Sequence, residues 1–274
     1  MKEHWTPEGD RILSEHYGKS PFRVIHALLP RRTRDAVKGR AHKLALTGDL
    51  ATVLPQAVKR YTIDGQFFHT PRLENSYWAG FIAADGCISP RQNSVKIMVC
   101  EKDSDHLSRF AASVGYDGPI RIHGAGSYKP QGLAATLNIC GVPGWIADLT
   151  HNFNVTARKS LTLQPPKILD WECSLAFIVG YLDGDGSIHM SLQQYKDSTY
   201  RSVVISFRGT ADLLGWIKAQ FDRLVPPHRG EASVIESGRY PEYKVRGKRA
   251  EAIIRVLASL DVPRLERKWA KADG

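Results

Sequence analysis

The chain has 274 residues and carries 38 Lys and Arg against 28 Asp and Glu, which gives a formal net charge of +10 and a pI near 9.5. This balance favours a polyanionic partner, most simply nucleic acid. Hydrophobic residues make up 42% of the sequence, which supports a substantial core, and the length allows two domains or one domain with a small module.

Neither a membrane protein nor a secreted one is expected. The longest strongly apolar run, around residues 175–182, is too short to span a bilayer, and no basic amphipathic helix is obvious. The N-terminus does not read as a signal peptide. The cysteines are scattered without a C-x-x-C pair, which indicates reduced thiols in a cytoplasmic protein, without a zinc site or a disulfide framework: Cys87, Cys100, Cys140 and Cys173.

Residues 1–47 predict a small module of three helices, at about 7–17, 21–28 and 33–46, with Thr6 and Thr33 as N-caps. The third helix follows a tight break at Pro30, and its outward face is basic, with Arg34, Lys38, His42 and Lys43. A helix-turn-helix places its reading helix in the major groove in this way. The alternative interpretation is a basic, solvated helix on a packing domain.

The same stretch looks like a Myb/SANT-like or related helix-turn-helix module, a resemblance carried by Trp5-Thr6, Glu8 and Arg32-Thr33. Residues 48–73 mix Gly, Pro and polar residues with short apolar pieces. We predict that this segment is a linker.

Two copies of one short pattern follow, at residues 78–86 and 178–186. Both read Gly, aromatic, aliphatic, any residue, small residue, Asp, Gly, and both predict a helix that ends in Asp-Gly. Asn75 or Ser76 is expected to cap the first helix and Ser174 the second. The closing glycines, Gly86 and Gly186, are expected in the left-handed conformation of a helix C-cap.

Small residues lie four apart in each copy, so they share one face of each helix, at Gly80 and Ala84 and at Gly180 and Gly184. Two such faces let helix backbones approach closely. Parallel packing through them brings together the two aspartates that end the copies, Asp85 and Asp185.

A helix C-terminus is an unfavourable place for a carboxylate, because the partial charge there is already negative and two neighbouring carboxylates repel. A divalent cation with a phosphate substrate would balance the pair, so these aspartates indicate chemistry more than structure. A calcium-binding loop at residues 183–194 is excluded, because Ile188 holds the position of its invariant glycine and Gln194 that of its final glutamate.

Each copy opens a similar downstream pattern of alternating strands and amphipathic helices, so the chain contains two repeats, at residues 74–166 and 167–274. The expected order in each repeat is αββαββα. The predicted fold class is α+β, with two pseudo-symmetric repeats that form antiparallel sheets, plus the small N-terminal three-helix domain. The repeats end alike, in Arg158-Lys159 and in Arg267-Lys268.

The paired motifs, residues 79–86 and 180–186, resemble those of the LAGLIDADG homing endonucleases, and the resemblance extends from about residue 74 to the C-terminus. It implies that the motif helices form the interface between two sheets that sit as a saddle on DNA. It also implies catalysis by Asp85 and Asp185 with bound Mg²⁺, for which Mn²⁺ or Ca²⁺ substitutes in binding. Ala84 and Gly184 are assigned to the same metal sites.

By the same resemblance, Lys159 and Lys268 match a basic residue that stabilises charge on the phosphate. A simple phosphate clamp is the alternative role. Asp183 has no equivalent in the first copy, where Ala83 stands, and is interpreted as structural. Antiparallel ribbons fit the major groove, so the open sheet faces and strand turns predict DNA contacts by Arg91, Lys96, Arg121, His189, Ser191, Gln193, Lys196, Lys244 and Arg246.

The expected function is that of a site-specific homing endonuclease that makes a metal-dependent double-strand break in a long DNA target. We expect a monomer with internal pseudo-twofold symmetry, encoded by a mobile intron or free-standing in phage or bacterial genomes, and acting in the cytoplasm. Two alternatives stay open. One is a non-cleaving RNA maturase or transcription regulator on the same scaffold, and the other is a strand-specific nickase.

Overall fold

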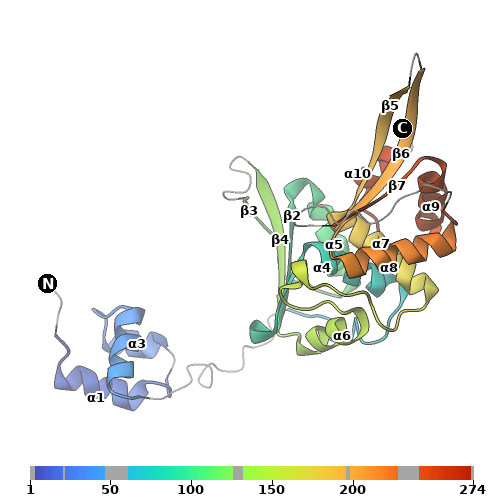
Figure 1. Ribbon diagram of the computed structural model, residues 1–274. Coiled ribbons are helices and arrows are strands. Elements are labelled where there is room, and N and C mark those ends of the chain that lie inside the picture. Colours follow the sequence, from blue (N-terminus) through green and yellow to red (C-terminus); the bar gives the residue numbers. More distant parts are fainter. Residues whose placement is uncertain are drawn as a thin grey trace. The chain divides into compact units, whose positions relative to one another are not determined.

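In the computed structural model, the described residues are 4–20, 22–46, 61–125, 132–195, 198–227 and 241–272. The chain divides into two compact units, Met1–Arg60 and Tyr61–Gly274 (Figure 1). None of the described helices is long and apolar enough to cross a membrane.

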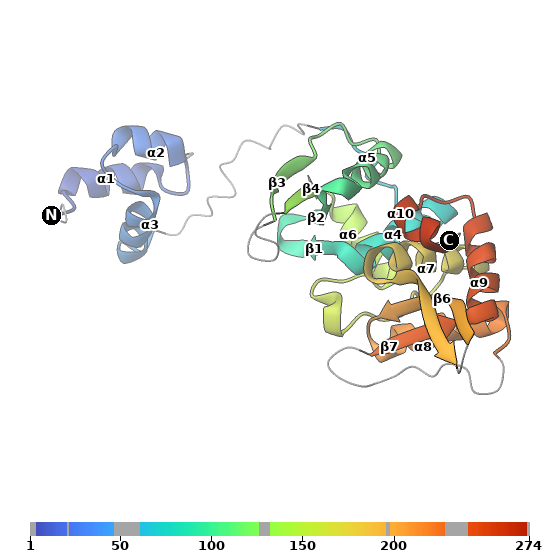
Figure 2. The ribbon, with the colours of Figure 1, turned by 90° about the horizontal axis from the view of Figure 1, so that it is seen from above.

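Unit 1 contains helices α1 (Pro7–His16), α2 (Phe22–Leu28) and α3 (Arg34–Lys43), which appear together in Figure 2. The predicted caps are present: Thr6 Oγ1 accepts from Gly9 N at 3.1 Å and Thr33 Oγ1 from Ala36 N at 3.2 Å. The helices pack around Leu13, Ile25 and Val37.

The outer face of α3 is exposed at the residues predicted to contact DNA, namely Arg34, Lys38, His42 and Lys43. Arg40 on the same helix has a different role, because its guanidinium makes a bidentate pair with Asp10 of α1 at 2.7 and 2.5 Å. This pair ties α3 to α1, while the basic outer face stays accessible.

The first half of unit 2 begins with helix α4 (Leu73–Asp85). It continues with β1 (Gly86–Ser89), β2 (Ser94–Cys100), α5 (Ser104–Ser113), β3 (Arg121–Gly124), β4 (Leu133–Cys140) and α6 (Pro143–Phe153), and with short 3-10 turns at η1 (Pro90–Gln92), η2 (Glu101–Asp103) and η4 (Lys159–Leu161). The strands form an antiparallel sheet in the order β1-β2-β4-β3, called here sheet A.

The second half begins with helix α7 (Trp171–Asp185). It continues with β5 (Ser187–Tyr195), β6 (Ser198–Arg208), α8 (Ala211–Leu224), β7 (Glu242–Arg246), α9 (Gly247–Ser259), α10 (Glu266–Trp269) and η5 (Ala270–Ala272). The described strands form an antiparallel sheet in the order β5-β6-β7, called here sheet B. The αββαββα order expected of each repeat also places a strand between α8 and β7, where residues 228–240 lie outside the described residues. The predicted α+β fold class is confirmed.

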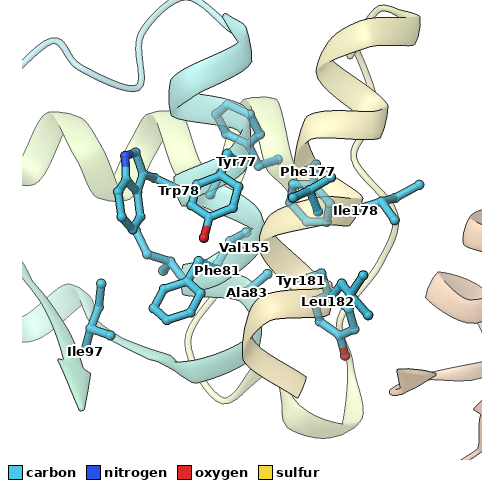
Figure 3. Packing of buried hydrophobic residues seen from close by; sticks show 14 of the residues in the cluster. Tyr77, Trp78, Phe81, Ala83, Ile97, Val155, Phe177, Ile178, Tyr181 and Leu182 are labelled. Atoms are coloured by element: carbon cyan, nitrogen blue, oxygen red, sulfur yellow. The ribbon is translucent and has the colours of Figure 1, made fainter. Parts of the chain in front are cut away.

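Helices α4 and α7 lie between the two sheets in both views (Figures 1 and 2). Each sheet turns one face inward, because alternate strand residues are apolar: Val95, Ile97 and Val99 on β2 are buried. The aromatic and aliphatic side chains of both helices join these strands in one continuous core (Figure 3). The opposite sheet faces stay open to solvent.

The close approach of α4 and α7 is confirmed. A Cβ added to Gly80 would lie 2.0 Å from the Phe177 carbonyl oxygen, and one added to Gly180 would lie 1.9 Å from the Tyr77 carbonyl oxygen. A Cβ on Gly184 would lie 2.2 Å from the Cβ of Ala84. Only glycine fits at these contacts, so the small residues of the two motifs set the distance between the helices.

The expected ends of the motif helices were wrong in detail. Helix α7 is capped by Asp170, whose carboxylate accepts from Cys173 N at 2.7 Å, and Ser174 lies inside the helix. Helix α4 starts at Leu73, and the Asn75 side chain accepts from Arg72 N at 2.7 Å from within the first turn.

The closing glycines of both motifs are extended and not left-handed, with φ of −82° at Gly86 and −89° at Gly186. They are required for a different reason. A Cβ on Gly86 would lie 2.6 Å from the Ile82 carbonyl oxygen, and one on Gly186 would lie 2.5 Å from Leu182 Cδ1. Here the chain turns sharply from helix into strand against the last helical turn.

The predicted linker, residues 48–73, ends earlier than expected, because residues from 61 onward pack on the first repeat. Phe67 and Phe68 are buried in its core, at 2% and 0% exposure. The Trp145 indole donates to the Asp64 carbonyl at 2.9 Å, and Asn152 Nδ2 donates to the Phe68 carbonyl at 3.0 Å. This segment therefore belongs to the folded unit.

Candidate active site

The last residues of α4 and α7 are the two motif aspartates, Asp85 and Asp185, and both side chains remain accessible to solvent. The carboxyl carbon of Asp85 lies 3.5 Å from the point that a Cβ on Gly184 would occupy. The close helix contact thus places the carboxylate of one motif against the end of the other motif, as the sequence predicts.

The surrounding protein makes this position unfavourable for negative charge. Although Asp85 keeps an exposed surface, neighbouring groups remove water from part of its carboxyl, and this partial desolvation, together with the charge of Asp185, raises its pKa to about 6. Burial also raises the pKa of Asp185, against the opposing effect of Lys159 and Lys268. The electrostatic cost of the pair is therefore present in the folded chain.

The two lysines that end the repeats lie at the same place in each half. Lys159 Nζ donates to the carbonyl oxygens of Gly86 at 2.6 Å and Ala84 at 3.3 Å. Each ammonium group reaches the carbonyls at the end of its own motif helix, where the helix dipole is negative.

Lys268 repeats this arrangement at the end of α7. Its Nζ donates to the carbonyl oxygens of Gly184 and Gly186, both at 2.8 Å, and of Leu182 at 3.1 Å. Burial lowers the pKa of both Lys159 and Lys268, while the nearby aspartates act in the opposite direction. In this structure both lysines cap helix ends, a role that the sequence did not suggest.

Asp183 lies inside the helix pair at 1% exposure. Its carboxylate accepts from the Tyr77 hydroxyl at 2.7 Å, from Leu265 N at 2.8 Å and from the Trp269 indole at 2.8 Å. Burial raises its pKa, and these hydrogen bonds act in the opposite direction. The residue thus joins α4, α7 and the C-terminal segment.

The donor set at the helix ends consists of oxygen atoms: the carboxylates of Asp85 and Asp185 and the carbonyls of Ala84 and Gly184. Each of these carbonyls accepts one lysine hydrogen bond and keeps a second lone pair. Hard divalent cations such as Mg²⁺ and Ca²⁺ prefer such ligands. A bound cation would offset the loss of hydration that raises the pKa of both carboxyls, and the repulsion by Asp185 that adds to it at Asp85. The residues therefore fit a divalent cation. The described part of the chain contains no group of three or more His, Cys, Asp or Glu side chains that could hold a metal ion, so side chains supply only two carboxylates here and backbone carbonyls would complete the ligand set.

The open face of sheet B is hollowed next to Asp185, in a depression of about 360 Å³. Four predicted DNA contacts line it, namely His189, Ser191, Lys244 and Arg246. Gln193 lies on β5, but its side chain is not among those described, and Lys196 lies outside the described residues. The hollow thus brings predicted contacts from two strands of sheet B to the end of α7.

Two charged residues that line this depression, Arg208 and Glu242, are not among the DNA contacts predicted from the sequence. Glu242 pairs with Lys244 at 2.7 Å and with Arg208 at 3.7 Å, and both Glu242 and Arg208 line the depression. The alternation of residues along this strand could have predicted Glu242. Tyr243 and Val245 are apolar and point inward, so Glu242 and Lys244 share the opposite face.

Sheet A carries the remaining predicted contacts. Lys96 on β2 and Arg121 on β3 are exposed, and Arg91 is exposed in η1, which joins β1 to β2. In the strand register, Lys96 lies opposite Asn138, and Arg121 lies opposite Thr136. The two sheets therefore each present cationic side chains on the face away from the core.

No family model and no curated protein matches the sequence. Among solved structures, the meganuclease I-SmaMI bound to uncleaveable DNA is similar with a TM-score of 0.50 at 14% identity, over 74% of this chain and 87% of that chain.

Two further structures are similar at lower scores. The I-SmaMI LAGLIDADG homing endonuclease bound to cleaved DNA gives a TM-score of 0.48 at 14% identity, over 74% of this chain and 87% of that chain. The I-LtrWI LAGLIDADG homing endonuclease bound to target DNA gives 0.47 at 11% identity, over 76% and 89%. With its paired motif helices and two antiparallel sheets, the chain has the fold of the single-chain LAGLIDADG homing endonucleases.

Proposed function

We propose that the chain is a site-specific homing endonuclease, which hydrolyses one phosphodiester bond in each strand of a long DNA target with the help of Mg²⁺. The observation that carries this proposal is the pair Asp85 and Asp185. Two carboxylates held together at helix C-termini, with pKa values raised by burial, are costly for the fold and suited to a cation.

In this proposal Asp85, Asp185 and the carbonyls of Ala84 and Gly184 hold the metal. When bound, a divalent cation activates water and stabilises charge on the phosphate and the leaving oxygen. Lys159 and Lys268 keep positive charge beside the carboxylates and favour their ionised form. Because each half supplies one aspartate and one lysine, each half would serve one strand.

The open faces of sheets A and B supply the DNA-binding surface in this proposal, and the basic face of α3 adds phosphate contacts. Exposed Lys and Arg on both sheets suit a duplex, and side chains on antiparallel strands reach base edges in the major groove. The similar I-SmaMI structure is itself a DNA complex. A single chain supplies both halves, so the protein would act as a monomer on double-stranded DNA.

The test is cleavage of a randomised duplex library by the purified chain, with Mg²⁺, with EDTA, and with Asp85→Asn plus Asp185→Asn. Recurrent double-strand breaks at one long site that need Mg²⁺ and both aspartates support the proposal. Specific retention of DNA without cutting would replace it with a transcription regulator, and retention of RNA alone with a maturase.

A further inference from the structure

The two halves of the candidate site differ at one buried position. Asp183 stands two residues before Asp185 in α7, while the matching residue in α4 is Ala83, whose methyl group cannot accept a hydrogen bond. A buried carboxylate is unfavourable unless its environment supplies hydrogen bonds. Its partners therefore indicate what it does.

Two of the residues that donate to Asp183 flank Lys268, a candidate catalytic residue, in the sequence. The carboxylate of Asp183 accepts from Leu265 N and from the Trp269 indole, both at 2.8 Å. Between these two residues stands Lys268, whose ammonium group contacts the end of α7. Asp183 therefore holds the short segment 265–269 at both ends.

The same segment is also bound to the first half. Arg267 makes a bidentate pair with Asp103, with both contacts at 2.6 Å, and Asp103 is 7% exposed. Tyr77 of α4 donates to Asp183 at 2.7 Å. These contacts leave Lys268 little freedom, and its ammonium donates to the carbonyls of Leu182, Gly184 and Gly186.

Lys159 in the first half is held differently. It stands at the start of η4 after Arg158, which has a left-handed backbone with φ of 58°. Among the described residues its ammonium donates to two carbonyls, those of Gly86 and Ala84, and one of its three N–H groups is left over. Because position 83 is an alanine, no carboxylate there can accept hydrogen bonds from the residues that flank Lys159.

We propose that Asp183 is a positioning residue for the second half alone, which fixes Lys268 against the end of α7 beside the two motif aspartates. The inference rests on the proposed nuclease function. It makes the two halves unequal, so that loss of Asp183 affects cleavage of one DNA strand and spares the other.

The experiment is strand-resolved cleavage of the selected target by Asp183→Asn, with Lys159→Met and Lys268→Met as the variants that assign each strand to its half. Misplacement by about 1 Å can slow a reaction on the order of 100-fold. We expect Asp183→Asn to slow cleavage of the same strand as Lys268→Met does, by roughly tenfold or more. Cleavage of the other strand should keep its rate. Asp261→Asn, an exposed change near the segment, is the matched control.

A second readout does not depend on activity or metal. Amide hydrogen exchange of the peptide around residues 261–272 should increase in Asp183→Asn, while the peptide containing Lys159 keeps its exchange rate. If Asp183→Asn does not fold, Trp269→Phe removes one donor, retains an aromatic ring and should change both readouts in the same direction. Equal slowing of both strands, or unchanged exchange at residues 261–272, overturns the inference.

The outcomes separate the two proposals. If the unmodified chain does not cleave DNA, the nuclease proposal fails, and so does the predicted effect on one strand. The comparison of hydrogen exchange rates still decides whether Asp183 holds residues 265–269 in place. If the chain cuts and the variant slows both strands equally, the nuclease proposal stands and the positioning role falls.

Discussion

At the scale of single residues, the candidate site is a balance of like charges and their partners. Asp85 and Asp185 lie at helix ends that already carry partial negative charge, and Lys159 and Lys268 donate to the carbonyls that carry it. The lysines do not remove the cost, because the pKa of Asp85 is still raised to about 6. This residual cost leads to a prediction about stability.

The metal-free chain should be stabilised by Asp85→Asn at pH 7. Because folding raises the pKa of Asp85, the folded state favours the neutral carboxyl over the ionised one. The stability that the neutral carboxyl contributes is complete below the ordinary pKa of 3.8 and is lost as the pH rises through about 6. After allowance for solvent screening, we expect a gain of about 1 kcal/mol at pH 7, or about 2–4 °C in Tm.

Thermal unfolding in EDTA at pH 7 and at pH 4 measures this gain, with the exposed Asp261→Asn as control. The gain should be present at pH 7 and nearly absent at pH 4. A loss of stability at pH 7 would contradict the proposed cost of holding an ionised Asp85 carboxyl, partly desolvated and next to Asp185, at this helix end.

Glu242 leads to a second prediction at this scale. It is a carboxylate on the face proposed to meet DNA, where it pairs with Lys244 at 2.7 Å. Glu242→Gln removes repulsion from phosphates and releases Lys244. Binding of mixed-sequence duplex DNA should therefore tighten by about 1 kcal/mol, or roughly fivefold, at low salt.

Fluorescence anisotropy with a mixed-sequence duplex measures this change. The control is Glu251→Gln, an exposed residue on α9, the helix that packs against sheet B. Equal tightening by both variants would show that only net charge matters, and would remove any local role for Glu242.

At the scale of helices and sheets, the α4–α7 pair determines where both aspartates lie. Figure 3 shows Tyr77 and Phe81 of α4 beside Phe177 and Tyr181 of α7, with large rings packed along the contact. The rings can pack in this way because the glycines let the backbones approach. Packing at this density tolerates no added methyl group at the crossing.

Gly180→Ala should therefore destabilise the fold. The new Cβ would lie 1.9 Å from the Tyr77 carbonyl oxygen, a backbone atom that cannot rotate away. Overpacking of this kind costs about 3 kcal/mol or more. Urea unfolding measures the loss, and Gly215→Ala in α8 is the matched control, because nothing lies within 4 Å of its added Cβ.

Gly215→Ala should instead gain roughly 1 kcal/mol from helix propensity. Unchanged unfolding of Gly180→Ala would mean that the helices do not approach as the structure shows.

At the scale of the whole molecule, the chain has two compact units with separate cores, around Leu13, Ile25 and Val37 in unit 1 and around the α4–α7 pair in unit 2. Separate cores allow separate folding. The basic outer face of α3 is exposed and takes no part in the unit 1 core.

Residues 61–274 alone should fold with the Tm of unit 2 in the full chain and should bind DNA less tightly. If Arg34, Lys38 and Lys43 contact phosphates, the slope of log affinity against log salt should fall by roughly 2 to 3. The full chain with all three changed to Gln should show the same slope as the shorter chain. An unchanged slope in both would leave unit 1 without a DNA-binding role.

The sequence alone was sufficient for the features that depend on periodicity and spacing. Small residues four apart predict a close helix contact, and alternating apolar residues such as Val95, Ile97 and Val99 predict a half-buried strand. The α+β fold class and the meeting of the two motif ends followed from these patterns, because each needs only local geometry repeated along the chain.

Tertiary structure decided the rest, because the deciding partners lie far apart in sequence. Asp183 is 82 residues from Leu265, yet the two are hydrogen bonded, and Lys159 reaches Gly86 across 73 residues. Gly86 is required by contact with Ile82 in an extended conformation, where the sequence suggested a left-handed cap. A spacing rule reports which residues share a helix face, but the folded chain determines which distant groups a buried carboxylate or ammonium meets.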